Sequence, residues 1–321
     1  MDKAIKNISL IIPTKNEEGR LFNCLEAIKN LEYDDKLIEI NVIDNGSTDS
    51  TIEIAKSFGA RVYTRPDLKV SGLRNFGATH TIGDVLCFVD ADVIVSKGWL
   101  KAALIHLDDP NVGCITGMIK IPDNATWVEK TWALNRKIEK DVFEVKWASS
   151  MNMIIPKDIF IKVGGFSESI VTGEDVELSG RLRRLGYRIL FDTKVSVIHV
   201  GEAKTLTQLI KKERWRGYSD LDLLITNKFH ISNLRHATQP VFFIFSIFAF
   251  VITAFSGKIT LAVFFIFCIF SLPTLKTVLV LKKQKKINYI PQLIIVWFSY
   301  YISRSIAVFD NIKDKVKNIC K

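Results

Sequence analysis

An uncharged apolar stretch from His236 to Gly257 most constrains what this chain can fold into. It includes the run VFFIFSIFAFVITAF, which is long enough to cross a bilayer as a helix. A second apolar stretch, Ile259 to Leu281, follows and is interrupted only by Lys276. We therefore expect two transmembrane helices, at about residues 237–257 and 259–281, rather than a buried helical hairpin of a soluble core.

A third apolar stretch, Ile287 to Phe309, is of a different kind because Arg304 lies inside it. We predict a helix at about residues 288–309 that is interfacial, re-entrant or transmembrane. Positive residues favour the cytoplasmic side of a membrane. A third full span would carry the following lysines to the outside, namely Lys313, Lys315, Lys317 and Lys321. This favours an interfacial or re-entrant helix, with Arg304 extending to the lipid headgroups.

The other lysines near the apolar stretches predict the orientation. Only Lys258 lies between the first and second stretches, whereas four lie between the second and third: Lys282, Lys283, Lys285 and Lys286. A hairpin of two spans would place that cluster in the cytoplasm. The polar start, Met1 to Asn7, shows no secretory signal, and the five cysteines have no metal-like spacing. We expect an integral protein of the cell membrane with a cytoplasmic N-terminal domain and free thiols.

Up to about Asn227, short apolar runs alternate with amphipathic ones, which is typical of an α/β domain. We predict such a domain over residues 1–230 and a membrane domain over residues 231–321. The runs ISLIIP, IEINVI and VLCFV indicate buried strands. The expected strands are Ile8 to Pro13, Ile38 to Ile43, Ala60 to Tyr63 and Val85 to Val89. The expected helices are Leu21 to Leu31, a helix that runs to Phe58 with caps supplied by Thr48, Asp49, Ser50 and Thr51, and Gly72 to Thr81.

Two carboxylates follow the last of these strands directly, in the sequence Asp90-Ala91-Asp92. Side chains two residues apart on extended backbone project to the same side, and open α/β sheets bind ligands where their strands end. Mg²⁺ and Mn²⁺ prefer oxygen ligands and readily share phosphates. A solvated turn is the alternative for this motif taken alone, but its position after a buried strand favours a metal site.

Polar loops follow the first two strands as well, and each has groups that can hydrogen-bond a nucleoside. The candidate donor-binding residues are Pro13, Thr14, Asn16, Glu17 and Asp44. Ordinary turn and helix-cap chemistry is the alternative. Within the helix that precedes Asp90, Arg74 has two possible uses: pairing with a phosphate, or holding the carboxylates at the strand end.

The succession IIPTKNEE, VIDNGSTDST, GLRNFGA, GDVLCFVDAD, GGF, GEDVEL and VSVIH resembles the family 2 glycosyltransferases of GT-A fold, over roughly Ile8 to His199. The order and spacing of these pieces carry the resemblance. It implies a GT-A fold, a mostly parallel sheet flanked by helices, and inverting transfer from a nucleoside-diphosphate sugar, UDP- or GDP-linked. It also implies that Thr14, Glu17 and Asp44 hold the nucleoside, that Asp90 lies at the ribose and metal, and that Asp92 binds Mn²⁺ or Mg²⁺.

The resemblance further implies a catalytic role for GEDVEL, in which Asp175 matches the general base and Glu174 stands beside it. Inversion requires the acceptor hydroxyl to lose its proton while it attacks, and a carboxylate within hydrogen-bond reach can accept that proton. Helix capping by Glu174 and Asp175 is the alternative, and the two roles are compatible. His199 ends another apolar run, where the resemblance implies a metal ligand and a structural hydrogen bond is the alternative.

Basic residues precede the membrane part, and Arg214-Trp215 matches half of the Gln-x-x-Arg-Trp signature of processive synthases, with Lys211 in place of Gln. We therefore favour a single-addition enzyme with a lipid-linked or membrane-proximal glycan acceptor over two alternatives, a processive polysaccharide synthase and a catalytically inactive membrane-bound GT-A scaffold. The net charge of +10 fits anionic lipid or phosphate-bearing substrates. Nucleic acid is not expected as a partner beside a membrane hairpin.

Overall fold

The structure is a computed structural model that describes residues 6–136, 138, 140–220 and 231–319. The strands are β1 (Ile8–Thr14), β2 (Ile38–Asp44), β3 (Arg61–Thr64), β4 (Val85–Val89), β5 (Val93–Val95), β6 (Val112–Lys120), β7 (Val142–Glu144), β8 (Asn152–Pro156) and β9 (Arg188–His199). The helices are α1 (Glu18–Lys29), α2 (Thr51–Ser57), α3 (Val70–Thr79), α4 (Trp99–Leu104), α5 (Trp127–Ala133), α6 (Lys157–Lys162), α7 (Glu174–Arg184), α8 (Leu206–Gly217), α10 (Ile231–Phe255), α11 (Ile259–Gln284) and α12 (Ile290–Ile319).

The chain divides into two compact units, which we call the sheet unit and the helical unit. The sheet unit comprises residues 1–122, 138–169 and 174–201, and the helical unit comprises residues 123–137, 170–173 and 202–321. The boundary predicted at residue 230 lies outside the described residues, and the predicted division into an α/β and a membrane domain stays a prediction.

The sheet unit is built on one sheet with the strand order β3-β2-β1-β4-β8-β6-β9-β5, and β7 pairs with β9. Strands β3, β2, β1 and β4 are parallel, and β8 then runs antiparallel to β4. The predicted strands and helices between residues 8 and 89 are confirmed, with ends that differ by a few residues. Parallel strands buried on both faces read as continuous apolar runs, which is why periodicity located them.

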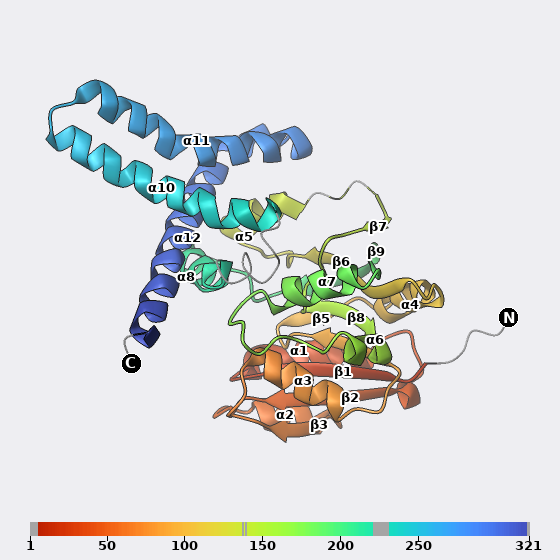
Figure 1. The fold of residues 1–321 in the computed structure, drawn as a ribbon. Coiled ribbons are helices and arrows are strands. Elements are labelled where there is room, and N and C mark those ends of the chain that lie inside the picture. The colour runs from red at the N-terminus through yellow and green to blue at the C-terminus, as the bar shows by residue number, and fades with distance from the viewer. Residues whose placement is uncertain (1–5, 137, 139, 221–230, 320–321) are drawn as a thin grey trace. The chain divides into compact units, whose positions relative to one another are not determined.

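Helices cover both faces of this sheet (Figure 1). Alternate residues of β1 point to opposite sides. Leu10 packs in a cluster with α1 and α4, whereas Ile11 packs in a second cluster with α3, α6 and α7. The polar loops follow the carboxyl ends of the parallel strands β1, β2 and β4.

In the helical unit, α10 and α11 run side by side and are joined by a short turn (Figure 1). Three helical segments are long and apolar enough to cross a membrane: Thr238–Phe255, Ile259–Gln284 and Ile287–Lys317. The first two expose large apolar side chains, among them Phe255 and Phe267. Of the third segment 56% is buried, against 17% and 28% of the first two. More than half of the third segment is therefore covered by other parts of the protein, whereas a helix that faces lipid can leave its apolar side chains exposed.

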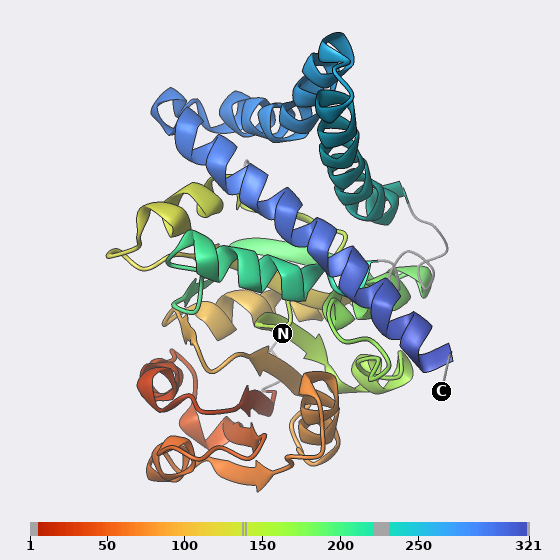
Figure 2. The same ribbon diagram turned by 90° about the vertical axis from the view of Figure 1, so that its left-hand side faces the viewer.

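The cover on α12 comes partly from α8, which lies alongside it (Figure 2). The Arg304 guanidinium donates to Glu213 of α8 at 2.8 Å and to Asp220 at 2.8 Å, and its side chain is only 12% exposed. The expectation that Arg304 extends to lipid headgroups is therefore wrong, because acidic partners inside the protein hold it. Gly217 allows this close approach, since a Cβ there would lie 2.6 Å from the Arg304 side chain.

This ion pair gives the first prediction. Replacing Arg304 with Ala removes the cation that bonds Asp220, whose side chain is 10% exposed, and one of the two cations that bond Glu213, the other being Arg216. Breaking a buried pair by removing one partner typically costs about 3 to 5 kcal/mol. We expect Arg304→Ala to lower the unfolding free energy of the helical unit by this amount, as measured by denaturant titration in detergent.

The matched control is Arg214→Ala. Arg214 also joins α8 to α12, through a pair with Asp310 at 2.6 Å, but its side chain is 52% exposed. Water and salt screen such a pair, so its loss has little effect. Equal losses of unfolding free energy in Arg304→Ala and Arg214→Ala would contradict the prediction that the buried pair contributes more stability than the exposed one.

Candidate functional site

The polar loops after β1 and β2 are joined to each other by hydrogen bonds. Thr14 and Asp44 are register partners at the ends of the two strands, and the Thr14 hydroxyl donates to Asp44 at 3.4 Å. Asn16 donates its N–H to Ser47 and accepts from the Thr48 N–H, each at 2.9 Å. Asn16 adopts a φ of 54°, which Asn tolerates better than most residues.

Asp44 is fully buried and accepts hydrogen bonds from its own loop, including the N–H groups of Gly46 at 2.8 Å and Ser47 at 2.9 Å. It thus fixes the shape of the loop, as an Asx turn does. Pro13 pairs with Ile43 inside the sheet, one residue before β1 ends. The predicted donor-binding residues of the first two strands therefore lie together at one sheet edge.

Glu17 belongs to a group of acidic residues in the sheet unit. Burial raises the pKa of Glu17, Arg20 opposes this increase, and the nearby Asp92 and Asp90 add to it. Arg20 bonds Glu17 at 2.8 Å and lies 3.8 Å from Asp92. Arg20 was not predicted as a site residue, although its position on α1, three residues after Glu17, is one at which a cation can pair with that carboxylate.

Asp92 and His199 meet, although they are far apart in sequence. The Asp92 Oδ2 atom lies 3.3 Å from the His199 Nε2 atom, because β5 pairs antiparallel with β9 and brings Val93 opposite His199. Gly201 lies against both side chains. A Cβ at Gly201 would lie 1.7 Å from Asp92 Oδ2 and 3.1 Å from His199 Nε2, so a side chain there would displace the Asp92 carboxylate from its present place.

These residues suit a divalent cation by their chemistry. A carboxylate and an imidazole are ligands that Mn²⁺ accepts, and further acidic groups stand close by. Among the residues that the structure describes, no set of three or more His, Cys, Asp and Glu side chains is already arranged around one point. A cation held by Asp92 and His199 would therefore need oxygen ligands from its substrate or from water, as Mg²⁺ and Mn²⁺ usually do.

Arg74 makes the second kind of contact considered from the sequence, with the carboxylates near the strand end. Its guanidinium donates to Asp90 at 2.7 Å and to Glu174 at 2.8 Å, and the side chain is 3% exposed. It therefore holds the carboxylate at the strand end together with the first residue of α7. The Ser150 hydroxyl also donates to Glu174, at 3.3 Å. Ser150 was not found by sequence reasoning, because nothing around it marks it.

Asp175 has a different environment from its neighbour Glu174. It accepts N–H hydrogen bonds from Ser150 at 3.3 Å and from Val176 at 2.8 Å. Burial raises the pKa of Asp175 to about 7, and the adjacent Glu174 carboxylate adds to this increase. Glu174 is thus paired with the Arg74 guanidinium. The pKa of Asp175 suits a base that works near neutral pH.

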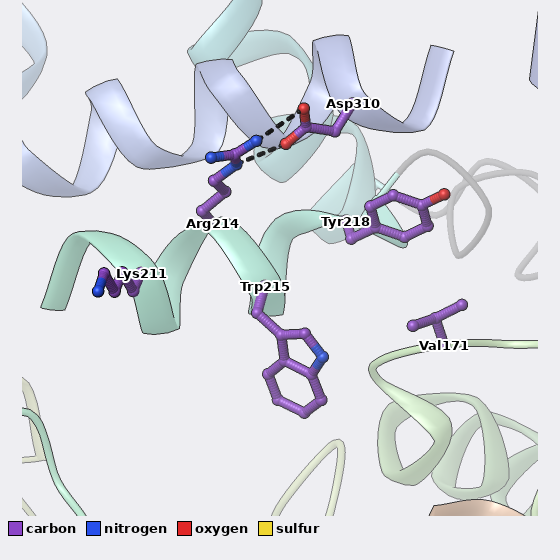
Figure 3. A pocket seen from close by; sticks show the side chains of 6 residues that line it. All are labelled: Val171, Lys211, Arg214, Trp215, Tyr218 and Asp310. Carbon is purple, nitrogen blue, oxygen red and sulfur yellow. Dashed lines mark hydrogen bonds and ion pairs between the residues drawn. The ribbon is translucent and has the colours of Figure 1, made fainter. Parts of the chain in front are cut away.

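A groove of about 510 Å³ lies in the helical unit (Figure 3). Four of its lining residues come from one face of α8 and the turn after it, and the full set is Val171, Lys211, Arg214, Trp215, Tyr218 and Asp310. Arg214 is fixed by two hydrogen bonds to Asp310, and the Tyr218 hydroxyl donates to Asp314 at 2.9 Å. Trp215 is 54% exposed and points away from α12 (Figure 3).

The family model and the relatives that this chain resembles are all glycosyltransferases. Residues 9–167 match the family model described as Glycosyl transferase family 2. Glycosyltransferase AglE of Haloferax volcanii is 26% identical over 66% of this chain and 72% of its own length. The probable glycosyltransferase YdaM of Bacillus subtilis is 28% identical over 59% of this chain, which spans about half (49%) of that relative.

The fold is shared with a solved structure. The mannosyltransferase PcManGT of Pyrobaculum calidifontis, in complex with GDP-Man and Mn²⁺, superposes with a TM-score of 0.71 at 17% identity, over 97% of this chain and 88% of its own. The predicted GT-A fold, with a mostly parallel sheet flanked by helices, is thereby confirmed. The chain belongs to the family 2 glycosyltransferases, and it is a glycosyltransferase of GT-A fold with apolar C-terminal helices.

Proposed function

We propose that this glycosyltransferase inverts the anomeric centre, transferring one sugar from a nucleoside-diphosphate sugar to a lipid-linked or membrane-proximal glycan, in cell-surface polysaccharide or glycolipid synthesis. The observation that carries the proposal is the arrangement around Arg74. This residue bonds both Asp90 and Glu174, so the acidic strand end and the GEDVEL helix belong to one site.

In the proposed step, Asp175 is the general base. The acceptor hydroxyl attacks the anomeric carbon from the face opposite the diphosphate and gives its proton to the Asp175 carboxylate. The new carbon–oxygen bond forms while the bond from that carbon to the phosphate oxygen breaks, and the nucleoside diphosphate departs. Glu174, held by Arg74 and Ser150, positions the first turn of α7 and does not take the proton.

For the donor, we assign the nucleoside to the joined loops after β1 and β2, with Thr14, Glu17 and Asp44 as its main contacts and Pro13 and Asn16 beside them. Asp90 is assigned to the ribose and the metal region. The hydrogen bonds between the two loops support this assignment, because a preformed loop pair loses less entropy when it binds. A UDP- or GDP-sugar fits these contacts.

We assign Asp92 and His199 to a Mn²⁺ or Mg²⁺ ion. Such an ion, when bound, offsets the negative charge that grows on the departing diphosphate. The meeting of Asp92 and His199 beside Gly201 supports the assignment. PcManGT is known in complex with both GDP-Man and Mn²⁺, which supports the same class of donor and ion.

We place the acceptor in the groove beside α8. Val171 lines this groove together with residues of α8. Trp215 offers an apolar ring with a polar N–H, and Lys211 offers a cation for phosphate. The lysines Lys282 to Lys286 support a cytoplasmic catalytic site on a membrane-anchored protein.

Two other functions are less well supported. An inactive scaffold of this fold would be expected to lose a key carboxylate, yet Asp90, Asp92 and Asp175 are all present. A processive synthase is disfavoured because Lys211 replaces the Gln of the Gln-x-x-Arg-Trp signature. Sizing the product on one acceptor distinguishes one added sugar from a polymer.

The base assignment predicts that Asp175→Asn lowers turnover by roughly 100- to 10,000-fold, the usual contribution of a general base. Turnover is measured as nucleoside diphosphate released from GDP- and UDP-sugars by the full chain in detergent. Because the base must be deprotonated, the wild-type rate should rise with pH up to about 7 and then level off. Normal turnover in Asp175→Asn would remove the assignment.

The melting temperature of Asp175→Asn tests whether the variant folds and whether the pKa of Asp175 is raised. A raised carboxyl pKa means that the folded state binds the proton more tightly than the unfolded state, so stability is lost as pH rises from about 4 to about 7. Asp175→Asn removes this loss. Its melting temperature should exceed that of the wild type by more at pH 8 than at pH 5.

The metal assignment predicts a Mn²⁺-dependent rise in melting temperature with GDP-mannose or UDP-N-acetylglucosamine, since a ligand that binds only the folded state stabilises it. Gly201→Ala should remove that rise, because the new Cβ would collide with Asp92. Gly98→Ala is the control, since the nearest atom to its Cβ lies 4.0 Å away. An undiminished Mn²⁺ effect in Gly201→Ala would contradict the assignment.

The acceptor assignment predicts that sealed inside-out vesicles transfer labelled sugar from added donor to solvent-extractable lipid, while right-side-out vesicles do not. Trp215→Ala and Lys211→Glu should reduce this labelling by about 10-fold, as loss of a central contact does, yet leave donor hydrolysis unchanged. Lys204→Glu makes the same charge change at an exposed site outside the groove. A matching loss in Lys204→Glu would show a general charge effect instead.

A further inference from the structure

The turn Gly164-Gly165-Phe166 follows α6 and is bonded to two other helices, α3 and α7. Its two glycines adopt φ values of +83° and +66°, which side chains rarely adopt. The Gly165 N–H donates to the Phe160 carbonyl at 3.1 Å, so α6 ends in this turn. Phe166 is 2% exposed, and the turn, α3 and α7 all belong to the sheet unit.

Asn75 of α3 holds Phe166 by both of its backbone groups. The Phe166 N–H donates to the Asn75 side-chain oxygen at 2.8 Å, and the Asn75 amide nitrogen donates to the Phe166 carbonyl at 2.9 Å. The same nitrogen also donates to Glu168 at 2.9 Å. A Cβ at Gly165 would lie 2.7 Å from the Asn75 oxygen, so a side chain there would displace Asn75.

Arg181 of α7 is bonded to the same turn. Its guanidinium donates to the Val163 carbonyl and, at 2.5 Å, to the Gly165 carbonyl. Glu177 lies four residues earlier on α7 and accepts from the guanidinium at 2.7 and 2.8 Å, which orients it. Carbonyls near the end of a helix need donors from outside that helix, and Arg181 supplies them. The turn is thus bonded to both α3 and α7.

The Phe166 ring lies beside the Arg74 guanidinium. The guanidinium carbon is 5.6 Å from the ring centroid, a distance at which the face of an aromatic ring attracts a cation. Arg74 precedes Asn75 on α3 and bonds both Asp90 and Glu174. The residue that holds the turn and the residue whose cation contacts it are therefore neighbours in one helix.

We propose that Asn75 and Arg181 are positioning residues, because their bonds to the turn, which we call the clasp, fix α3 and α7 to one another. The clasp keeps Arg74 against Glu174, and this inference rests on the proposed role of the next residue, Asp175. If the clasp opens, the Arg74 cation moves away from the two acids at the start of α7. The Glu174 charge then raises the pKa of Asp175 further, because Arg74 opposes it less.

Asn75→Leu tests the clasp, because leucine has about the size of asparagine but its side chain cannot hydrogen-bond. We expect kcat for nucleoside diphosphate release by the full chain in detergent, from a panel of UDP- and GDP-sugars, to fall roughly 10- to 100-fold. Small displacements of a catalytic group have effects of that size. The pH at which the rate levels off should move above the value of about 7 expected for the wild type. Amide exchange of Phe166 should become faster.

A second substitution should rescue a different variant of Asn75. Asn75→Asp keeps the acceptor for the Phe166 N–H but replaces the amide nitrogen with an oxygen that faces the Glu168 carboxylate. Like charges repel, so kcat should fall as in Asn75→Leu. Adding Glu168→Gln restores a donor between residues 75 and 168, and most of the lost kcat should return. If Asn75→Leu does not fold, Arg181→Lys takes its place, since one ammonium bonds two carbonyls less well than a guanidinium.

Glu39→Ala is the matched control. The Glu39 carboxylate also joins separate segments of the sheet unit, because it accepts from the N–H groups of Ile82 at 2.7 Å and Gly83 at 3.2 Å. It lies near the amino end of β2, whereas Asp44 ends that strand at the site. Glu39→Ala should lower the melting temperature but leave kcat and its pH profile unchanged.

The outcomes separate this inference from the proposed function. Wild-type kcat with a wild-type pH profile in Asn75→Leu would overturn the positioning role, and so would the same pH shift in Glu39→Ala. Failure of Glu168→Gln to restore kcat in Asn75→Asp would overturn it too. Normal turnover in Asp175→Asn would instead refute the base assignment. In that case faster exchange of the Phe166 amide in Asn75→Leu would still report the clasp.

Discussion

The buried guanidinium of Arg74 is the interaction on which the arrangement of the site depends. Asp90 follows β4 and Glu174 begins α7, and their carboxylates would repel each other without a cation between them. A guanidinium has five N–H donors in one plane, so one side chain bonds both carboxylates, which a lysine ammonium does less well. A strand end and a helix start are thereby held in one geometry.

The helical unit uses the same chemistry for a different purpose. Arg304 lies in an apolar helix, and Glu213 and Asp220 hold it inside the protein. A buried charge is tolerated only with partners, so this part of α12 must stay against α8. Of the apolar segments on α10 and α11, only 17% and 28% is buried. The three apolar segments are each long enough to cross a membrane, but they differ in how much of each the protein covers.

Local patterns predicted the parts of the fold that depend on local chemistry. We could locate β1, β2 and β4 and the helices between them, because the spacing of apolar residues can be read without knowing the tertiary contacts. The meeting of Asp92 with His199 came from family resemblance, since it depends on the pairing of β5 with β9. The place of Arg304 was predicted wrongly, because its acidic partners lie far away in the sequence.

Glu174 and Asp175 show why the sequence alone leaves roles within a motif open. They are adjacent and chemically alike, yet Arg74 reaches only the first in the hydrogen bonds described here. The second keeps its proton more tightly because burial and its neighbour both disfavour its charged form. The difference between them is made by residues from α3 and from the Ser150 turn, and each of these contacts depends on the folded chain. Whether a carboxylate can act as a base therefore depends on the groups around it as much as on the carboxylate itself.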